Sequence, residues 1–189
     1  MVPDLKGYSM KTGPITFSVA TPEDMHALGR DLARLVDKGD LVILTGDLGA
    51  GKTQLTQGIG EGLDVVGHVI SPTFVLSRVH RSRGEGPALV HVDAYRLTST
   101  YEVDDLDLDQ SMDSSVTVVE WGRGLVEHLN DDYLDIDILR SQDIEDETRQ
   151  VLVTGQGSRW AELIDQWEAL MNLDMGRDAR ADAEGDGDV

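Results

Sequence analysis

The chain has 189 residues, of which 40% are hydrophobic and 28% charged, a balance typical of one globular domain with its own core. It contains no cysteine, which excludes disulfides, thiolate metal sites and cysteine nucleophiles. The formal net charge of −20 predicts a poor independent binder of nucleic acid, because phosphate contacts supply most of that affinity. If the protein acts on RNA, we expect a partner to hold the RNA.

The two ends of the chain differ from its middle. Residues 1–14 are a mixed stretch with glycine and proline, and we expect a flexible extension there. Residues 174–189 are acidic and lack apolar side chains that could build a core, which predicts a disordered tail. The domain is therefore expected to span 15–173. Because no apolar run resembles a membrane helix or a signal peptide, we expect a cytoplasmic protein that does not contact a membrane.

The predicted elements alternate between helices and strands along the chain. A helix is predicted to begin at Thr21, which can cap it, and the run ends at Gly39. The apolar run 41–44 is typical of a strand buried on both faces, and a helix follows residue 53. Further strands are predicted at 73–79, 88–92, 116–119, 134–138 and 150–154. Helices are predicted at 98–110 and after a capping Ser158.

The strongest motif lies directly after the first buried strand. Residues 46–53 read Gly46-Asp47-Leu48-Gly49-Ala50-Gly51-Lys52-Thr53, a full match to the phosphate-binding pattern GxxxxGK[ST]. The glycines let the backbone approach phosphates, and successive N–H groups form an anion nest at a helix N-terminus. Lys52 is expected to reach the β- and γ-phosphates, and the Thr53 hydroxyl to coordinate Mg²⁺. The absence of a guanine signature such as NKxD favours ATP.

The order of the elements and this motif together predict the fold class. Alternating strands and helices indicate an α/β layered fold of the P-loop NTPase type, with a largely parallel central sheet flanked by helices. Ligands of such folds bind at the carboxyl ends of the strands. The phosphate-binding motif falls at that place.

A nucleotide site of this type also needs an acid near the metal, at the end of a neighbouring strand. Asp93 follows the predicted strand 88–92, and Glu120 follows the predicted strand 116–119. Either acid can serve Mg²⁺, and the other can orient the attacking water.

Two other features allow more than one interpretation, and a third, His91, has one. Ser71-Pro72-Thr73 is either a loop whose hydroxyl senses the γ-phosphate or a rigid turn that enters a strand. The basic cluster Arg78–Arg83 is either a solvated hairpin tip or a docking patch for RNA or an acidic partner. His91 lies in a predicted buried strand and is interpreted as structural.

Four segments in this order resemble the TsaE (YjeE) family. They are the phosphate loop, Ser71-Pro72-Thr73-Phe74, His91-Val92-Asp93-Ala94-Tyr95-Arg96-Leu97 and Val119-Glu120-Trp121. The likeness covers roughly residues 15–155. The patterns HxDxYRL and VEW, at this distance after a phosphate loop, are specific to that family, whereas the terminal segments and residues 78–87 lie outside it.

The resemblance implies a bacterial Mg²⁺-dependent ATPase that supports the threonylcarbamoyl modification of the tRNA adenosine beside the anticodon. It implies TsaD and TsaB as protein partners, with tRNA contacted indirectly through their complex. TsaD would carry out the transfer, and the ATPase would allow the cycle to turn over.

The resemblance also implies roles for individual residues. Lys52 would bind phosphate, and Thr53 and Glu120 would hold Mg²⁺. Asp93 would be a catalytic or metal-linked acid. Arg149 is the best positional match for a late arginine of the family that approaches the nucleotide. Three further residues are implied to lie near the site: Tyr95, Arg96 and Trp121.

Two other functions are compatible with a phosphate loop. A small-molecule kinase would need an acceptor pocket and an arginine-bearing lid, for which only the cluster Arg78–Arg83 is available. A non-catalytic scaffold would use ATP binding alone to order the loop Ser71–Phe74 and expose a docking surface; Asp93 and Glu120 argue against it. We expect slow turnover by the isolated ATPase, because no arginine finger is evident in the core motifs.

Overall fold

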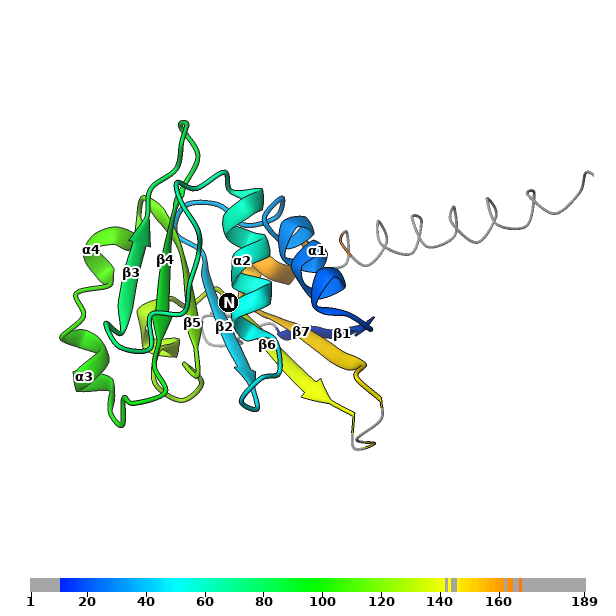
Figure 1. The fold of residues 1–189 in the computed structure, drawn as a ribbon. Helices are drawn as coiled ribbons and strands as arrows, with labels where there is room; N and C mark the ends of the chain where they lie inside the picture. Colours follow the sequence, from blue (N-terminus) through cyan, green and yellow to red (C-terminus); the bar gives the residue numbers. More distant parts are fainter. Residues whose placement is uncertain (1–10, 142, 144–145, 162, 165–166, 168–189) are drawn as a thin grey trace, which may run out of the picture.

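The computed structural model describes residues 11–141, 143, 146–161, 163–164 and 167, and it shows a seven-stranded sheet flanked by helices (Figure 1). The strands lie in the order β1-β7-β6-β2-β5-β4-β3. Their bounds are β1 Lys11–Val19, β2 Leu41–Gly46, β3 Ser77–His80, β4 Ala88–Asp93, β5 Ser115–Glu120, β6 Tyr133–Arg140 and β7 Arg149–Gln156. The helices are α1 Pro22–Leu32, α2 Lys52–Gly62, α3 Thr100–Asp104, α4 Asp109–Met112 and the 3-10 helix η1 Glu127–Leu129.

The centre of the sheet is parallel, as predicted. The strands β6, β2, β5 and β4 are paired parallel to one another, whereas β1, β7 and β3 pair antiparallel with their neighbours. The run 41–44 is buried on both faces, which confirms that prediction. Val42 and Leu44 belong to one hydrophobic cluster and Leu41 and Ile43 to another. The prediction of a layered α/β fold with a largely parallel core is confirmed.

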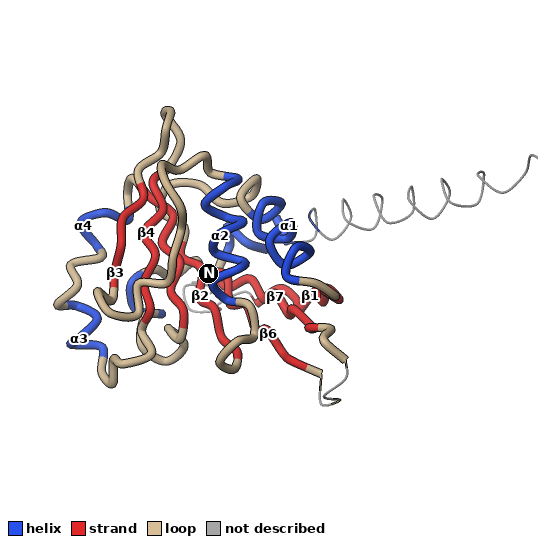
Figure 2. Tube along the Cα trace, in the orientation of Figure 1, coloured by secondary structure: helices blue, strands red, loops and turns tan. Residues whose placement is uncertain are grey.

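Helices cover both faces of this sheet. The helices α1 and α2 lie side by side on one face, where Leu32 and Ile59 are fully buried (Figures 1 and 2). The short helices α3 and α4 cover the other face, where Val103 and Met112 pack with the second cluster. Residues 158–161, 163–164 and 167 are helical, which confirms the predicted helix, although Ser158 lies in the helix and not at the predicted capping position before it; Trp160 is buried in the first cluster. Within the described residues, no helix is long and apolar enough to cross a membrane.

The start of α1 follows the predicted capping pattern. Thr21 accepts a hydrogen bond from the Asp24 backbone N–H at 3.1 Å, and the Asp24 carboxylate accepts one from the Thr21 N–H at 3.0 Å. Pro22 lies at the first helical position, where its missing N–H costs nothing. The helix ends at Leu32, before the predicted end at Gly39. The local sequence therefore determines where α1 begins.

The prediction of a flexible extension over residues 1–14 was wrong for residues 11–14. The strand β1 begins at Lys11 and pairs antiparallel with β7, with Ile15 opposite Val153. Ile15, Phe17 and Val19 alternate with polar residues, but the backbone partners that hold the strand lie far away in the sequence. Residues 1–10, the predicted tail 174–189 and the predicted domain end at 173 lie outside the described residues.

The predicted strand 73–79 begins only at Ser77. The N–H groups of Val75 and Leu76 both donate to the oxygen of Pro72, at 2.8 and 2.7 Å, and so form a turn. Leu76 has a φ of 64°, which no strand accommodates. Residues 73–76 therefore belong to a loop at the carboxyl end of β4.

The predicted helix 98–110 is two short helices, α3 and α4. Asp107 lies between them with a φ of 53°, in the left-handed region, and this interrupts the helical path. Ser99 caps α3 by accepting a hydrogen bond from the Glu102 N–H. The buried side chains of Val103 and Leu108 hold both helices against the sheet.

The helices α1 and α2 touch through their backbones. A Cβ atom on Gly58 of α2 would overlap the carbonyl oxygen of His26 on α1, and one on Gly29 would overlap the oxygen of Leu55. This close approach also brings Met25 of α1 against the phosphate loop. Only glycine permits it, since every other residue carries a Cβ.

We predict that Gly58→Ala lowers the free energy of unfolding by about 1–3 kcal/mol, because the new methyl group forces the two helices apart. At an unconstrained helix position the same change would stabilise by about 0.5–1 kcal/mol. Urea unfolding measures the difference. The control is Gly84→Ala, where a Cβ meets no atom within 4 Å and we expect little change. A Gly58→Ala protein as stable as the wild type would contradict the close packing.

Candidate functional site

The loop Gly46–Gly51 joins the carboxyl end of β2 to the first turn of α2, which begins at Lys52. Gly51 precedes the helix with a φ of 117°, a left-handed conformation that favours glycine. No side chain of the described residues caps this turn. The first N–H groups of any α-helix have no intrahelical partner, and here no described side chain takes that place. Together with the helix dipole, these free N–H groups can hold an anion.

The Lys52 side chain is buried and lies across this loop. Its Nζ donates hydrogen bonds to the backbone oxygens of Gly46 at 2.7 Å and Asp47 at 3.0 Å. The same atom lies 3.8 Å from the centroid of the Trp121 ring, a cation–π contact. Burial lowers the pKa of Lys52, and nearby carboxylates oppose that shift. The ammonium group is thus held beside the place where an anion would meet the helix N-terminus.

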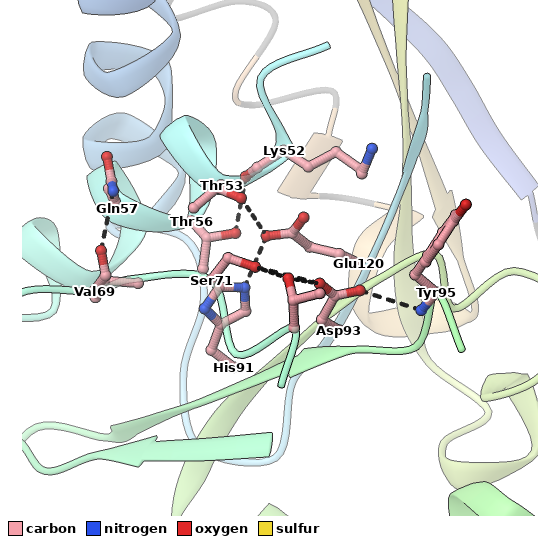
Figure 3. A network of polar contacts seen from close by, with 11 residues as sticks. Lys52, Thr53, Thr56, Gln57, Val69, Ser71, His91, Asp93, Tyr95 and Glu120 are labelled. Carbon is pink, nitrogen blue, oxygen red and sulfur yellow. Dashed lines mark hydrogen bonds and ion pairs between the residues drawn. The ribbon is translucent and has the colours of Figure 1, made fainter. Parts of the chain in front are cut away.

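Glu120 connects α2 to the sheet. The Thr53 hydroxyl donates to Glu120 Oε1 at 2.9 Å, and His91 Nε2 lies 2.8 Å from the same oxygen (Figure 3). Because a carboxylate only accepts, His91 Nε2 must carry the hydrogen. Among the described residues, none donates a hydrogen bond to Glu120 Oε2, although the side chain as a whole is only about 5% exposed. One carboxylate oxygen is thus occupied twice and the other remains for a ligand.

Asp93 is the last residue of β4 and is in register with Glu120 of β5. Its Oδ2 accepts hydrogen bonds from Thr73 Oγ1 at 2.7 Å and Ser71 Oγ at 3.2 Å, and its Oδ1 accepts one from the Tyr95 N–H at 3.1 Å (Figure 3). The carboxylate therefore holds the loop that contains both hydroxyls. The structure brings Ser71 and Thr73 to the candidate site, next to the acid.

Trp121 closes one side of the site. Its N–H donates to the Leu44 oxygen at 2.9 Å, which continues the pairing of β5 with β2. Its φ of 63° is unusual for a bulky residue and turns the chain out of the strand. The ring meets Tyr95 edge-to-face, with 5.3 Å between centroids. Arg96 lies instead over the exposed ring of Phe74, at 5.4 Å.

The structure brings most of the predicted site residues together in one pocket of about 270 Å³. Lys52, Thr53, Asp93 and Glu120 all line it. Trp121 and the hydroxyl residues of the 71–73 loop complete the wall. Of the remaining loop residues, Leu48, Gly49 and Gly51 line this pocket, whereas Gly46, Asp47 and Ala50 do not.

Arg149 lies at the start of β7, on the other side of the phosphate loop. It lines a smaller pocket of about 120 Å³ together with Thr21 and Met25. Gly49, Gly51 and Gln54 line both pockets, so the loop separates them. The structure therefore places Arg149 near the loop but apart from the two acids.

Arg83 lines a separate pocket of about 520 Å³ at the far end of α2, and the basic cluster Arg78–Arg83 does not reach the larger of the two pockets beside the phosphate loop. Within the described part of the chain, no arginine lines that pocket. Arg83 pairs instead with Asp64 at 3.3 Å and donates to the Val65 oxygen at 3.4 Å. The cluster therefore contributes nothing to the wall of the pocket that the two acids line.

The oxygen atoms in the larger pocket suit a magnesium ion that binds together with phosphates. Mg²⁺ prefers oxygen ligands and usually takes one or two from the protein, with phosphates and waters completing the octahedron. Glu120 Oε2 and the Thr53 hydroxyl offer such oxygens beside a helix N-terminus. Among the described residues there is no group of three or more His, Cys, Asp or Glu that could hold a metal alone. The residues fit Mg²⁺ when a nucleotide is present.

The contact between His91 and Glu120 was not predicted from the sequence, which indicated only a buried structural histidine, and the structure shows that the residue is fully buried. A signal was present in the motif spacing. His91 and Asp93 are two residues apart on β4, so their side chains point to the same face. Glu120 lies on that face of the neighbouring strand, two residues beyond the Val118 that pairs with His91.

Comparisons with known proteins place the chain beside a single family. Residues 19–151 match the family model described as "Threonylcarbamoyl adenosine biosynthesis protein TsaE". The tRNA threonylcarbamoyladenosine biosynthesis protein TsaE of Streptomyces coelicolor is 60% identical over 139 residues, which cover 72% of this chain and 94% of that protein. The protein of the same name from Bacillus subtilis is 35% identical over 160 residues, which cover 84% and 97%.

The fold is also similar to that of a solved structure. The crystal structure of Bacillus subtilis YdiB matches with a TM-score of 0.67 and 28% sequence identity. The match covers 87% of this chain and 98% of that chain. The similarity thus extends over nearly the whole of the solved chain.

We predict that Thr73→Val loosens the loop at Asp93, because valine has a similar shape but lacks the hydroxyl that donates to the carboxylate. A hydrogen bond to a charged group contributes about 1.5–3 kcal/mol, so amide hydrogen exchange at Val75 and Leu76 should be about tenfold faster or more. The control is Thr98→Val, since Thr98 also donates to a carboxylate, that of Glu102. Equal exchange rates at Val75 and Leu76 in all three proteins would contradict a stabilising role for the hydrogen bond between Thr73 and Asp93.

Proposed function

We propose that this chain, which belongs to the TsaE family of tRNA threonylcarbamoyladenosine biosynthesis proteins, is a Mg²⁺-dependent ATPase of that pathway. The role in the pathway follows from the family, whose model matches residues 19–151. The observation that carries the ATPase proposal is the pocket that Lys52, Thr53, Asp93 and Glu120 line together.

The phosphates of ATP would bind at the N-terminus of α2. The free N–H groups of the first turn and the Gly46–Gly51 loop would surround them. Lys52 would turn from the backbone oxygens that it now contacts toward the β- and γ-phosphates, an exchange of neutral acceptors for charged ones. Arg149, in the adjoining smaller pocket, would contact a part of the nucleotide beyond these phosphates.

The two acids would take different roles. Glu120 shares a hydrogen bond with Thr53, and these two residues would hold Mg²⁺. The ion would neutralise charge on the β- and γ-phosphate oxygens. Asp93 lies in register with Glu120 and in the same pocket, and it would accept a hydrogen bond from the attacking water. The water oxygen would bond to the γ-phosphorus as the bond to the bridging oxygen breaks, which gives ADP and phosphate.

Hydrolysis would be linked to the surface through the loop 71–76. Ser71 and Thr73 bind the carboxylate of Asp93, so a change at the γ-phosphate would move this loop. Phe74 in the loop is 87% exposed and Tyr95 is 64% exposed, and both are available to a partner protein. We propose TsaD and TsaB as these partners, in the cytoplasm.

Partner dependence follows from two further features of the chain. Among the described residues, the wall of the larger pocket contains no arginine that could stabilise the transition state, so turnover would be slow without a partner. The net charge of −20 disfavours direct binding of tRNA, so tRNA would be contacted through the complex.

We predict that Lys52→Ala fails to restore tRNA threonylcarbamoyladenosine in cells depleted of this protein, whereas the wild type restores it. The variant should bind ATP about 10- to 100-fold more weakly, because a charged hydrogen-bond donor is lost. The readout is the nucleoside content of tRNA together with ATP binding in vitro. The control is Lys38→Ala, whose Nζ contacts the oxygen of Glu85 in the described structure. Modification that is unaffected by depletion would contradict the pathway role.

We predict that Asp93→Asn reduces ATP turnover by about 100-fold or more while ATP binding is kept, because the acid orients the water. Free phosphate and bound ATP are measured with and without TsaD and TsaB. The two partners should increase the rate of ATP turnover by the wild type. Normal tRNA modification in cells that contain only Asp93→Asn or only Glu120→Gln would mean that ATP binding without hydrolysis suffices.

Transfer of labelled γ-phosphate to a metabolite, with no release of free phosphate, would instead indicate a kinase.

A further inference from the structure

We propose that His91 is a positioning residue, which fixes the carboxylate of Glu120 so that Oε2 faces the magnesium position. The inference rests on the proposed function, because it concerns a metal that binds with the nucleotide. It assigns a purpose to a buried polar residue that lines neither of the two pockets beside the phosphate loop.

The geometry is that of a rigid support. His91 lies in the middle of β4 and its side chain is fully buried. Its Nε2 lies 2.8 Å from Glu120 Oε1, the same oxygen that accepts the Thr53 hydroxyl. A hydroxyl rotates to follow a carboxylate, but a planar ring packed on a strand cannot. His91 therefore restricts the rotation of the Glu120 carboxylate in a way that Thr53 does not.

The burial of His91 also needs an explanation that packing does not provide. Its Nδ1 is buried without a hydrogen-bond partner in the described structure, so the ring bears the cost of an unpaired polar atom. An apolar side chain would fill the same space without that cost. The hydrogen bond to Glu120 is the contact that an apolar residue could not make.

The consequence for metal binding follows from how the two oxygens of Glu120 are used. Two donors converge on Oε1, which leaves Oε2 as the oxygen directed to a cation. Outer partners that orient a metal ligand typically contribute 10- to 100-fold in metal affinity or activity. Loss of the His91 donor should therefore weaken the response to Mg²⁺ without removing the phosphate-binding loop.

The test compares His91→Asn with His91→Gln in the full chain. Both keep a polar amide, but only glutamine is long enough to place a nitrogen near the position of Nε2. A fluorescent ATP analogue reports binding while Mg²⁺ is titrated, and its affinity is also measured in EDTA. We expect His91→Asn to raise the half-saturating Mg²⁺ concentration about 10- to 100-fold. His91→Gln should return the half-saturating Mg²⁺ concentration toward the wild-type value. In EDTA, the wild type and both variants should bind the ATP analogue with equal affinity.

The matched control is His80→Asn. His80 is a second buried histidine, on β3, and within the described residues its Nε2 has no hydrogen-bond partner and its ring makes no hydrogen bond or ion pair with Glu120. It should leave the Mg²⁺ response unchanged, and circular dichroism checks that each variant is folded.

Several outcomes would overturn the inference. They are an unchanged Mg²⁺ response in His91→Asn, an equal shift in His80→Asn, and no recovery in a folded His91→Gln. A wild type that binds the analogue with no dependence on Mg²⁺ would overturn it as well. A wild type that binds no ATP analogue at all would overturn the proposed function itself, so the two failures are distinguishable.

Discussion

The register of the parallel strands β2, β5 and β4 is the constraint on which the site depends. Glu120 of β5 is in register with Leu44 on one side and Asp93 on the other. The backbone continues this alignment past the strand ends, where Trp121 N–H donates to the Leu44 oxygen and Ala94 N–H to the Glu120 oxygen. A slip of one residue would turn every side chain to the opposite face. The positions of the acids are thus determined by the apolar strands that carry them.

The glycine contact between α1 and α2 has a similar effect on the phosphate loop. Because the two backbones touch at Gly58, α1 lies close enough for Met25 to pack beside Gly51. Thr21 and Met25 then line the smaller pocket on one side of the loop, while the acids line the larger pocket on the other. The close packing of two helices therefore gives the loop two distinct neighbouring pockets.

The polar groups of the larger pocket come from elements that are far apart in the sequence. Glu120 is bonded by Thr53 from α2 and by His91 from β4, whereas Asp93 is bonded by hydroxyls of the 71–73 loop. Buried carboxylates are costly unless they are paired or hydrogen-bonded. These hydrogen bonds reduce that cost. They also connect Glu120 to α2 and Asp93 to the 71–73 loop, so a displacement of either carboxylate would be passed on to that element.

The sequence by itself determined the features whose causes are local. The apolar run 41–44, the glycines and Lys52 after it predict a buried strand, a phosphate-binding loop and a helix, because each depends on neighbouring residues only. Thr21 and Pro22 likewise determine the start of α1. The segment order also allowed the family and the parallel core to be recognised, and both are confirmed.

Only the tertiary structure decided the features whose partners are remote in the sequence. The strand β1 was missed because its backbone partner is β7, and residues 73–76 form a loop because Asp93 and Pro72 bind them. The sequence named both acids but could not show that Thr53 contacts Glu120, because the two residues lie 67 positions apart in the chain. The hydrogen bond between His91 and Glu120 was not predicted for the same reason. This contact depends on the register between two strands, which a local pattern does not specify.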